Sequence, residues 1–69
     1  MKSCFSENLK QLRIEKNLGQ VELAKILGVS KAIISLWENE LREPTLSNLI
    51  SIALYFKVSI DYLVGLSEE

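Results

Sequence analysis

The sequence contains no histidine, one cysteine and one proline, and no apolar run approaches the roughly 18 residues that span a membrane. Without histidine there is no Ser-His-Asp triad, no histidine general base and no zinc site of the usual Cys/His kind. The single Cys4 cannot build a disulfide framework. The N-terminus lacks the apolar region of a signal peptide. We therefore expect a soluble cytoplasmic protein that is not an enzyme and uses no metal or cofactor.

Composition favours one small folded domain over residues 1–69. The chain is 48% hydrophobic and 25% charged, which suits a packed core and not a disordered chain. A chain this short buries only about 60% of its unfolded surface, so its stability should be modest. The net charge of −1 is not that of a nonspecific nucleic-acid coat. Any nucleic-acid role must depend on where the charges lie.

Short helical patterns alternate with turn residues, and no segment shows sustained period-2 alternation, so we expect an all-α fold with five short helices. The first should begin at the cap Ser6 and end at Asn17-Leu18-Gly19. The other caps are Ser30, Thr45 and Ser59, and Gly28 and Gly65 are stops. The other four helices are expected at Gln20–Leu27, Ser30–Glu38, Leu46–Phe56 and Ile60–Val64. Expected core-facing positions are Phe5, Leu9, Leu12, Leu23, Ala24, Leu27, Ile34, Trp37, Leu46, Leu49, Ala53 and Phe56.

The segment from Gln20 to Asn39 is the most informative. Only Gly28, Val29 and Ser30 separate its two helices, too few for antiparallel packing, so the helices should cross steeply as in a helix-turn-helix. The small Ala24 allows them to approach closely. Trp37 could stack on a base, but its spacing from the inward Ile34 favours a place in the core.

With these features, the sequence resembles the phage repressor and Cro-type family, also called the XRE family. The resemblance covers about residues 5 to 66. It rests on Gln20, Ala24, Gly28, Ile34 and Trp37-Glu38-Asn39, with Glu7-Asn8-Leu9, Arg42-Glu43-Pro44 and Ser59-Ile60-Asp61-Tyr62-Leu63 on either side.

The resemblance implies a lambda-repressor-like domain that binds double-stranded DNA, with the helix from Ser30 to Glu38 in the major groove. It implies phosphate contacts from Gln20, Asn39 and Arg42, and it pairs Arg13 with Glu38. This pair should be partly buried, because each residue follows an inward one. Three positions depart from the family pattern: Gly19 stands for Ser or Thr, Glu40 for Gly, and Leu41 for a cation.

Helical geometry indicates which side chains would face DNA. At about 100° per residue, four side chains point away from the inward Ile34 and Trp37, and Ile33 lies at the boundary. The four are Lys31, Ala32, Ser35 and Leu36. Together with the phosphate contacts that the resemblance implies, the expected DNA-contacting residues are Gln20, Ser30, Lys31, Ala32, Ser35, Leu36, Asn39 and Arg42. Ala32 and Leu36 can offer only apolar contact, which suits the thymine methyl group. The sequence thus predicts A·T pairs opposite these two residues and at most one specified G, opposite Lys31.

The helix expected at Leu46–Phe56 is apolar nearly all round, which indicates a second buried face and a homodimer. The expected dimer residues are Leu54, Tyr55, Ile60, Tyr62 and Leu66. The leading hypothesis is a dimeric transcriptional repressor or autoregulator that reads a pseudo-palindromic operator. The alternative is an antitoxin-like or anti-repressor module that binds a protein partner, supported by the acidic pI, by Leu41 and by apolar residues on the recognition helix.

Overall fold

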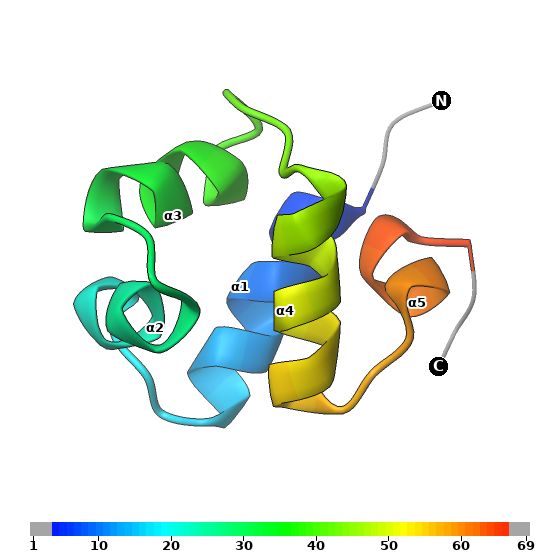
Figure 1. The fold of residues 1–69 in the computed structure, drawn as a ribbon, viewed down its shortest axis with the longest axis horizontal. Helices are drawn as coiled ribbons and strands as arrows, with labels where there is room; N and C mark the ends of the chain where they lie inside the picture. Colours follow the sequence, from blue (N-terminus) through cyan, green and yellow to red (C-terminus); the bar gives the residue numbers. More distant parts are fainter. Residues whose placement is uncertain (1–3, 67–69) are drawn as a thin grey trace.

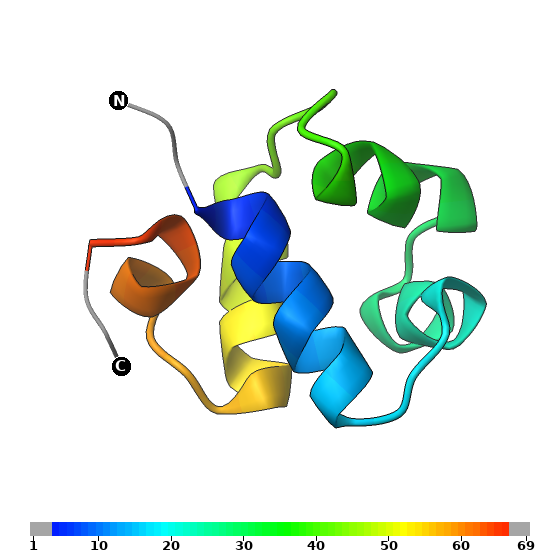
Figure 2. The same cartoon turned by 180° about the vertical axis from the view of Figure 1, so that it is seen from behind.

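The computed structural model describes residues 4–66 and consists of five helices joined by short turns (Figure 1). The helices are α1 (Phe5–Glu15), α2 (Gln20–Leu27), α3 (Lys31–Glu38), α4 (Leu46–Phe56) and α5 (Ile60–Val64). Helices α1 and α4 lie in the middle of the molecule, with α4 in front in Figure 1 and α1 in front in Figure 2. The pair α2 and α3 lies on one side of them, and α5 on the other.

The all-α prediction is confirmed, and four of the five helices have the expected bounds to within a residue. Their caps follow the sequence signals: the side chains of Ser30, Thr45 and Ser59 accept hydrogen bonds from backbone N–H groups three residues ahead. The prediction of Ser6 as the cap of the first helix was wrong. Helix α1 begins at Phe5 with Cys4 as its N-cap, and Ser6 is buried inside the helix. Phe5 is a core residue, so the helix starts early enough to bury it.

All five helices end in the same way. The residue after each helix, or one residue further on, has a positive φ, and the next N–H bonds back to a carbonyl five residues earlier. This is the Schellman arrangement, which satisfies carbonyls that a helix end leaves unpaired. Glycine adopts the positive φ at two ends, whereas three ends use larger residues. The five residues are Asn17, Gly28, Glu40, Lys57 and Gly65.

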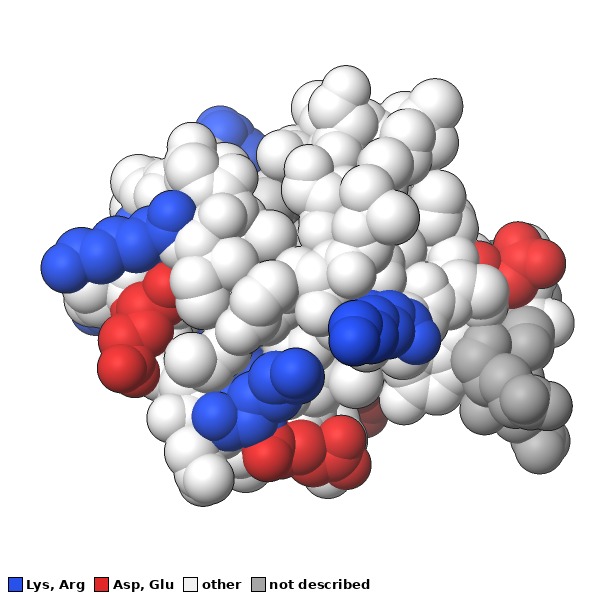
Figure 3. All heavy atoms as spheres, turned by 60° about the horizontal axis from the view of Figure 1, so that its bottom comes forward, with Lys and Arg blue, Asp and Glu red and all other residues white. Residues whose placement is uncertain are grey.

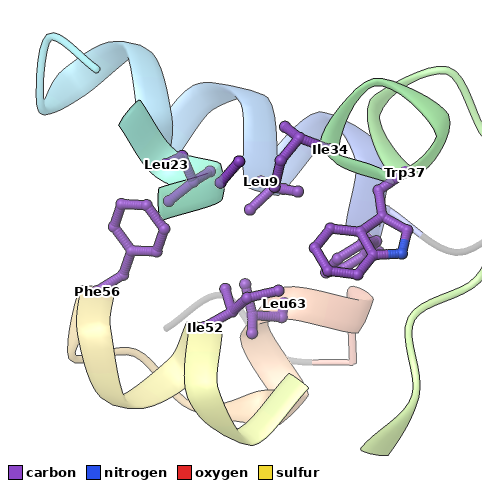
Figure 4. Packing of buried hydrophobic residues seen from close by; sticks show 9 residues of the cluster. Leu9, Leu23, Ile34, Trp37, Ile52, Phe56 and Leu63 are labelled. Atoms are coloured by element: carbon purple, nitrogen blue, oxygen red, sulfur yellow. The ribbon is translucent and has the colours of Figure 1, made fainter. Parts of the chain in front are cut away.

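The core lies where the helices converge, and each of them contributes to it (Figure 4). Trp37 is its largest fully buried side chain and meets the ring of Phe5 edge-on, with 6.1 Å between ring centroids. The interpretation of Trp37 as a core residue is confirmed. The buried hydrophobic residues are Phe5, Leu9, Leu23, Ala24, Ile34, Trp37, Ile52, Phe56 and Leu63.

The inward face of α4 was only partly predicted. Leu49, Ala53 and Phe56 pack on the core as expected, but Leu46 is 66% exposed and Ile52 is the fully buried residue. Leu46 lies about 120° around the helix from Ile52, so the two cannot share one buried face. Burial follows the spacing of Ile52 and Phe56, one turn apart.

Tyr55 was expected to point outward, and this was also wrong. It is half-buried against the core, its ring meets Phe56 at a centroid distance of 4.9 Å, and the ammonium of Lys16 lies 5.3 Å from its centroid. A tyrosine beside the core edge buries its ring and keeps its hydroxyl in water. Leu54 remains outward, 74% exposed.

A side chain of α1 fixes the last helix. The amide of Asn8 donates hydrogen bonds to the backbone carbonyls of Tyr62, at 2.8 Å, and Leu63, at 3.4 Å. These carbonyls lie in the last turn of α5, where a helix leaves carbonyls without a regular partner, and that of Tyr62 also accepts the N–H of Gly65 at 3.1 Å. Asn8 therefore completes the end of a five-residue helix that is too short to be stable alone.

Glu40 stands at the helix end where the resemblance expects glycine, and its φ is +60°. A left-handed residue with a side chain destabilises the folded state by about 1–2 kcal/mol. Glycine removes this cost, but the greater entropy of the unfolded chain cancels roughly half of the gain. We predict that Glu40→Gly raises the melting temperature by a few degrees, measured by thermal circular dichroism. The control Glu15→Gly, at a helical position, should lower it. A fall for both variants would contradict the strain at Glu40.

Candidate nucleic-acid interface

A turn of three residues joins α2 to α3. Gly28 adopts a φ of +73°, Val29 donates its N–H to the Ala24 carbonyl, and the hydroxyl of Ser30 accepts the N–H of Ile33. Ala24 is buried where the two helices meet. The close approach allowed by Ala24 and the left-handed Gly28 produce the steep crossing that the sequence predicted, and one side of α3 is left uncovered (Figure 1).

Helix α3 separates its core side from its outer side. Ile34 and Trp37 are buried, Ile33 is half-buried at the boundary, and Lys31 and Ala32 are exposed, all as expected from the helical geometry. Ser30, before the helix, is also exposed.

Leu36 is half-buried, not fully outward. The chain turns back after Glu38, and the N–H of Leu41 bonds to the carbonyl of Leu36 at 2.9 Å. A contact between these two side chains commonly accompanies such a helix end. The outer face of α3 therefore consists of two exposed residues, Lys31 and Ala32, and two that are partly covered, Ser35 and Leu36.

Two of the expected contact residues are joined to each other. The amide of Asn39 donates to the Ser35 carbonyl at 2.8 Å and to its hydroxyl oxygen at 3.2 Å. A hydroxyl that accepts a hydrogen bond keeps its own proton to donate. The Ser35 hydroxyl thus keeps its own proton available for a further hydrogen bond. Arg42 is exposed in the loop that follows.

Arg13 and Glu38 form the ion pair that the resemblance implied. Arg13 Nε lies 2.8 Å from one carboxylate oxygen and Nη2 lies 3.1 Å from the other, a bidentate geometry. The third nitrogen, Nη1, donates to the Leu18 carbonyl at 2.8 Å. The side chains are 12% and 4% exposed. The hydrogen bonds that Arg13 donates to Glu38 raise the pKa of Arg13 against the opposing effect of burial.

Gln20 is the first residue of α2, and its side chain is turned toward this pair. Its Nε2 donates to Glu38 Oε1 at 3.2 Å, and the residue is half-buried. The family resemblance implied Gln20 as a phosphate contact. The contact with Glu38, 18 residues away, was not predicted, because no local sequence pattern indicates it.

Charges around the interface are mixed. Lys31 and Arg42 are exposed cations, but Glu22 lies at the start of α2, where its carboxylate accepts the Gly19 N–H at 2.6 Å. Figure 3 shows basic and acidic side chains interspersed on one face of the molecule, several of them near its middle, beside an uncharged area in the upper half of the view. Residues 4–66 contain no group of His, Cys, Asp or Glu side chains suited to a metal ion. No helix among them is long and apolar enough to cross a membrane.

Comparison with known proteins identifies this arrangement. A family model described as helix-turn-helix matches residues 9–63. The chain is 44% identical over 61 residues to the HTH-type transcriptional activator BcrR of Enterococcus faecalis, covering 88% of this chain and 30% of that protein. It is 34% identical over 60 residues to the repressor protein C2 of Salmonella phage P22, covering 87% and 28%. The chain belongs to the XRE family of helix-turn-helix proteins.

A solved structure extends the XRE comparison to the fold. The P22 c2 repressor protein in complex with a synthetic operator superposes with a TM-score of 0.85 at 32% identity, covering 91% of this chain and 96% of that one. This confirms the resemblance read from the sequence. The chain spans less than a third of either curated XRE relative.

The ion pair of this XRE domain predicts a strong dependence of stability on Arg13. Removing one partner leaves the other charge buried without compensation, which costs about 3–5 kcal/mol, a large part of a small domain's stability. Arg13→Ala should therefore lower the melting temperature sharply in thermal or urea unfolding. The control Lys10→Ala, an exposed position of the same helix, should change it little. A shift of only a degree or two for Arg13→Ala would show that the pair contributes little.

Proposed function

We propose that this chain is a sequence-specific DNA-binding domain of a transcriptional regulator, with α3 placed in the major groove. The observation that carries the proposal is the exposed outer side of α3 on a steeply crossed pair of helices whose fold matches that of a repressor in complex with an operator. Ser30, Lys31, Ala32, Ser35 and Leu36 are the base-reading candidates. Gln20, Asn39 and Arg42 are the phosphate-contact candidates.

The chemistry of α3 limits what it can read. Lys31 can donate to the acceptors of guanine, and the Ser35 hydroxyl, which accepts a hydrogen bond from Asn39, keeps its proton for one further acceptor. Ala32 and the accessible part of Leu36 can contact only thymine methyl groups. Each good bidentate contact discriminates by about 1–3 kcal/mol, so a helix with two polar readers should be modestly selective.

Electrostatic attraction should be modest as well. The chain has a net charge of −1, and the acids Glu40 and Glu43 lie within two residues of Arg42 in the sequence. Few phosphates are then neutralised, so the affinity should fall less steeply with salt than for strongly basic domains.

Selection of bound duplexes from a random pool tests this function. We expect a site with A·T pairs opposite Ala32 and Leu36 and at most one fixed G. Leu36→Gln should relax or change the preference at one base pair per half-site, whereas Ile14→Gln, on the exposed surface of α1, should leave it unchanged. Failure to enrich any sequence would contradict DNA reading. Unchanged preference with loss of a co-purifying protein would favour an antitoxin-like interaction module.

We also propose that the chain acts as a homodimer through α4 and α5. Helix α4 has no charged residue and exposes three apolar residues one turn apart, Leu46, Ile50 and Leu54, which we call the α4 stripe. Leu66 is exposed beyond α5, and Ile60 and Tyr62 are half-buried. An uncharged apolar stripe is self-complementary, as a two-fold contact requires. Tyr55 packs on its own core, so it contributes less than the sequence suggested.

The size of the domain is compatible with this dimer. Recognition helices one DNA turn apart are separated by about 34 Å, so each lies roughly 17 Å from the two-fold axis. A domain with extents of 27 × 24 × 21 Å can hold a helix at that distance from one of its faces.

Sedimentation at micromolar concentration tests the dimer. We predict that the wild-type chain sediments as a dimer and that Leu54→Glu makes it monomeric, because a charge would be buried beside its symmetry mate. Ile14→Glu, an equal change at an exposed apolar residue of α1, should leave the dimer intact. A wild-type chain that remains monomeric and binds single half-sites would contradict the proposal.

A further inference from the structure

The carboxylate of Glu38 serves two elements at once. Its two oxygens accept hydrogen bonds from Nε and Nη2 of Arg13 on α1. One of them, Oε1, also accepts a hydrogen bond from Nε2 of Gln20 on α2. With a side chain only 4% exposed, Glu38 lies under the start of α2 and not on the surface. The end of α3 is thereby connected to the first residue of α2 by a side-chain hydrogen bond.

The state of the Gln20 amide follows from this contact. A glutamine Nε2 carries two N–H groups, and the bond to Glu38 uses one of them. The amide is planar, so fixing one N–H also fixes the direction of the other. Because Gln20 is only half-buried, the amide is not sealed in the interior.

The charge balance permits a phosphate nearby. A lone carboxylate at the start of α2 would repel DNA, but the guanidinium of Arg13 meets Glu38 through two hydrogen bonds and neutralises it locally. A neutral amide held by this pair can then donate to a phosphate oxygen without opposition from the Glu38 charge, although the exposed carboxylate of Glu22 also lies at the start of α2. Gln20 also opens α2, where the helix dipole favours an anion.

We propose that Glu38 is a positioning residue for DNA binding: held by Arg13, it fixes the Gln20 amide so that the remaining N–H is presented to a DNA phosphate. This inference rests on the proposed function. It assigns the ion pair a second role, which is to order the Gln20 side chain before DNA binds. A side chain ordered before binding loses less conformational freedom on binding than a mobile one. The Gln20 contact is neutral, so it should add affinity without adding to the salt dependence.

Binding to a mixed-sequence DNA duplex tests the contact, since phosphates carry no sequence information. We expect Gln20→Ala to weaken binding by about 3- to 10-fold with an unchanged slope of log K against log salt. Arg42→Ala should reduce that slope by about one, as the loss of a cation–phosphate contact does. Gln11→Ala is the matched control, because Gln11 also donates to a carboxylate, that of Glu15, but on α1. It should change neither quantity.

A double-mutant cycle tests the positioning role of Glu38. Glu38→Gln should weaken binding about as much as Gln20→Ala, and the double variant should be no weaker than Glu38→Gln alone. The assay is run at a temperature where thermal melting shows every variant folded. Additive losses would overturn the proposal, because they would mean that Gln20 acts without Glu38.

Nuclear magnetic resonance of the side-chain amides gives a readout that does not depend on the Glu38 variant folding. In the free wild-type chain the Gln20 amide should be more ordered than the exposed Asn and Gln amides. On addition of duplex, one of its protons should shift strongly while the other keeps its position. A Gln20 amide as mobile as that of Gln11, or one that leaves Glu38 on binding, would overturn the proposal. A wild-type chain that binds no duplex at all would instead contradict the proposed function.

Discussion

The buried ion pair between Arg13 and Glu38 is the interaction on which the arrangement of the first three helices depends. Arg13 projects from α1, Glu38 ends α3, and the remaining Arg13 contact holds the loop before α2 through Leu18. Apolar packing tolerates small rotations of one helix against another, whereas a bidentate pair requires one geometry. A hydrophobic replacement could be equally stable. The charged pair instead fixes how α2 and α3 are presented together.

The second constraint is the large share of backbone that lies at helix ends. No helix within residues 4–66 exceeds 11 residues, so most helical turns contain N–H or C=O groups that have no partner inside the helix. At the C-terminus of each helix, a residue with a positive φ is followed by an apolar residue whose N–H bonds to a carbonyl of the last turn. These apolar residues are, in order, Leu18, Val29, Leu41, Val58 and Leu66. Three of these, Leu18, Val29 and Val58, pack against the core, so the same residue that ends a helix also anchors the next turn. Leu41 and Leu66 are exposed, so they do not anchor the turn to the core.

Local patterns were enough to predict most of the fold, because caps, glycines and helical spacing act within a few residues. Ser30, Thr45, Ser59, Gly28 and Gly65 all mark helix ends as expected. The errors concern tertiary packing. The exposure of Leu46, the covering of Leu36 and the contact of Gln20 with Glu38 each depend on a neighbour that lies elsewhere in the chain or on the next turn. The expected DNA contacts of α3 follow from helical geometry, but no spacing rule indicates which amide meets which carboxylate.

The hydrogen bonds from Asn8 to the carbonyls of α5 have a consequence for synthesis on the ribosome. They join residues 54 and 55 positions apart, and the buried Leu63 contributes to the same core as Leu9. A nascent chain that ends before α5 lacks a core residue and leaves Asn8 without these partners. At about 5–20 residues per second, Asn8 is synthesised roughly 3–11 s before these two partners. The domain can reach its native state only once nearly all of it has left the exit tunnel.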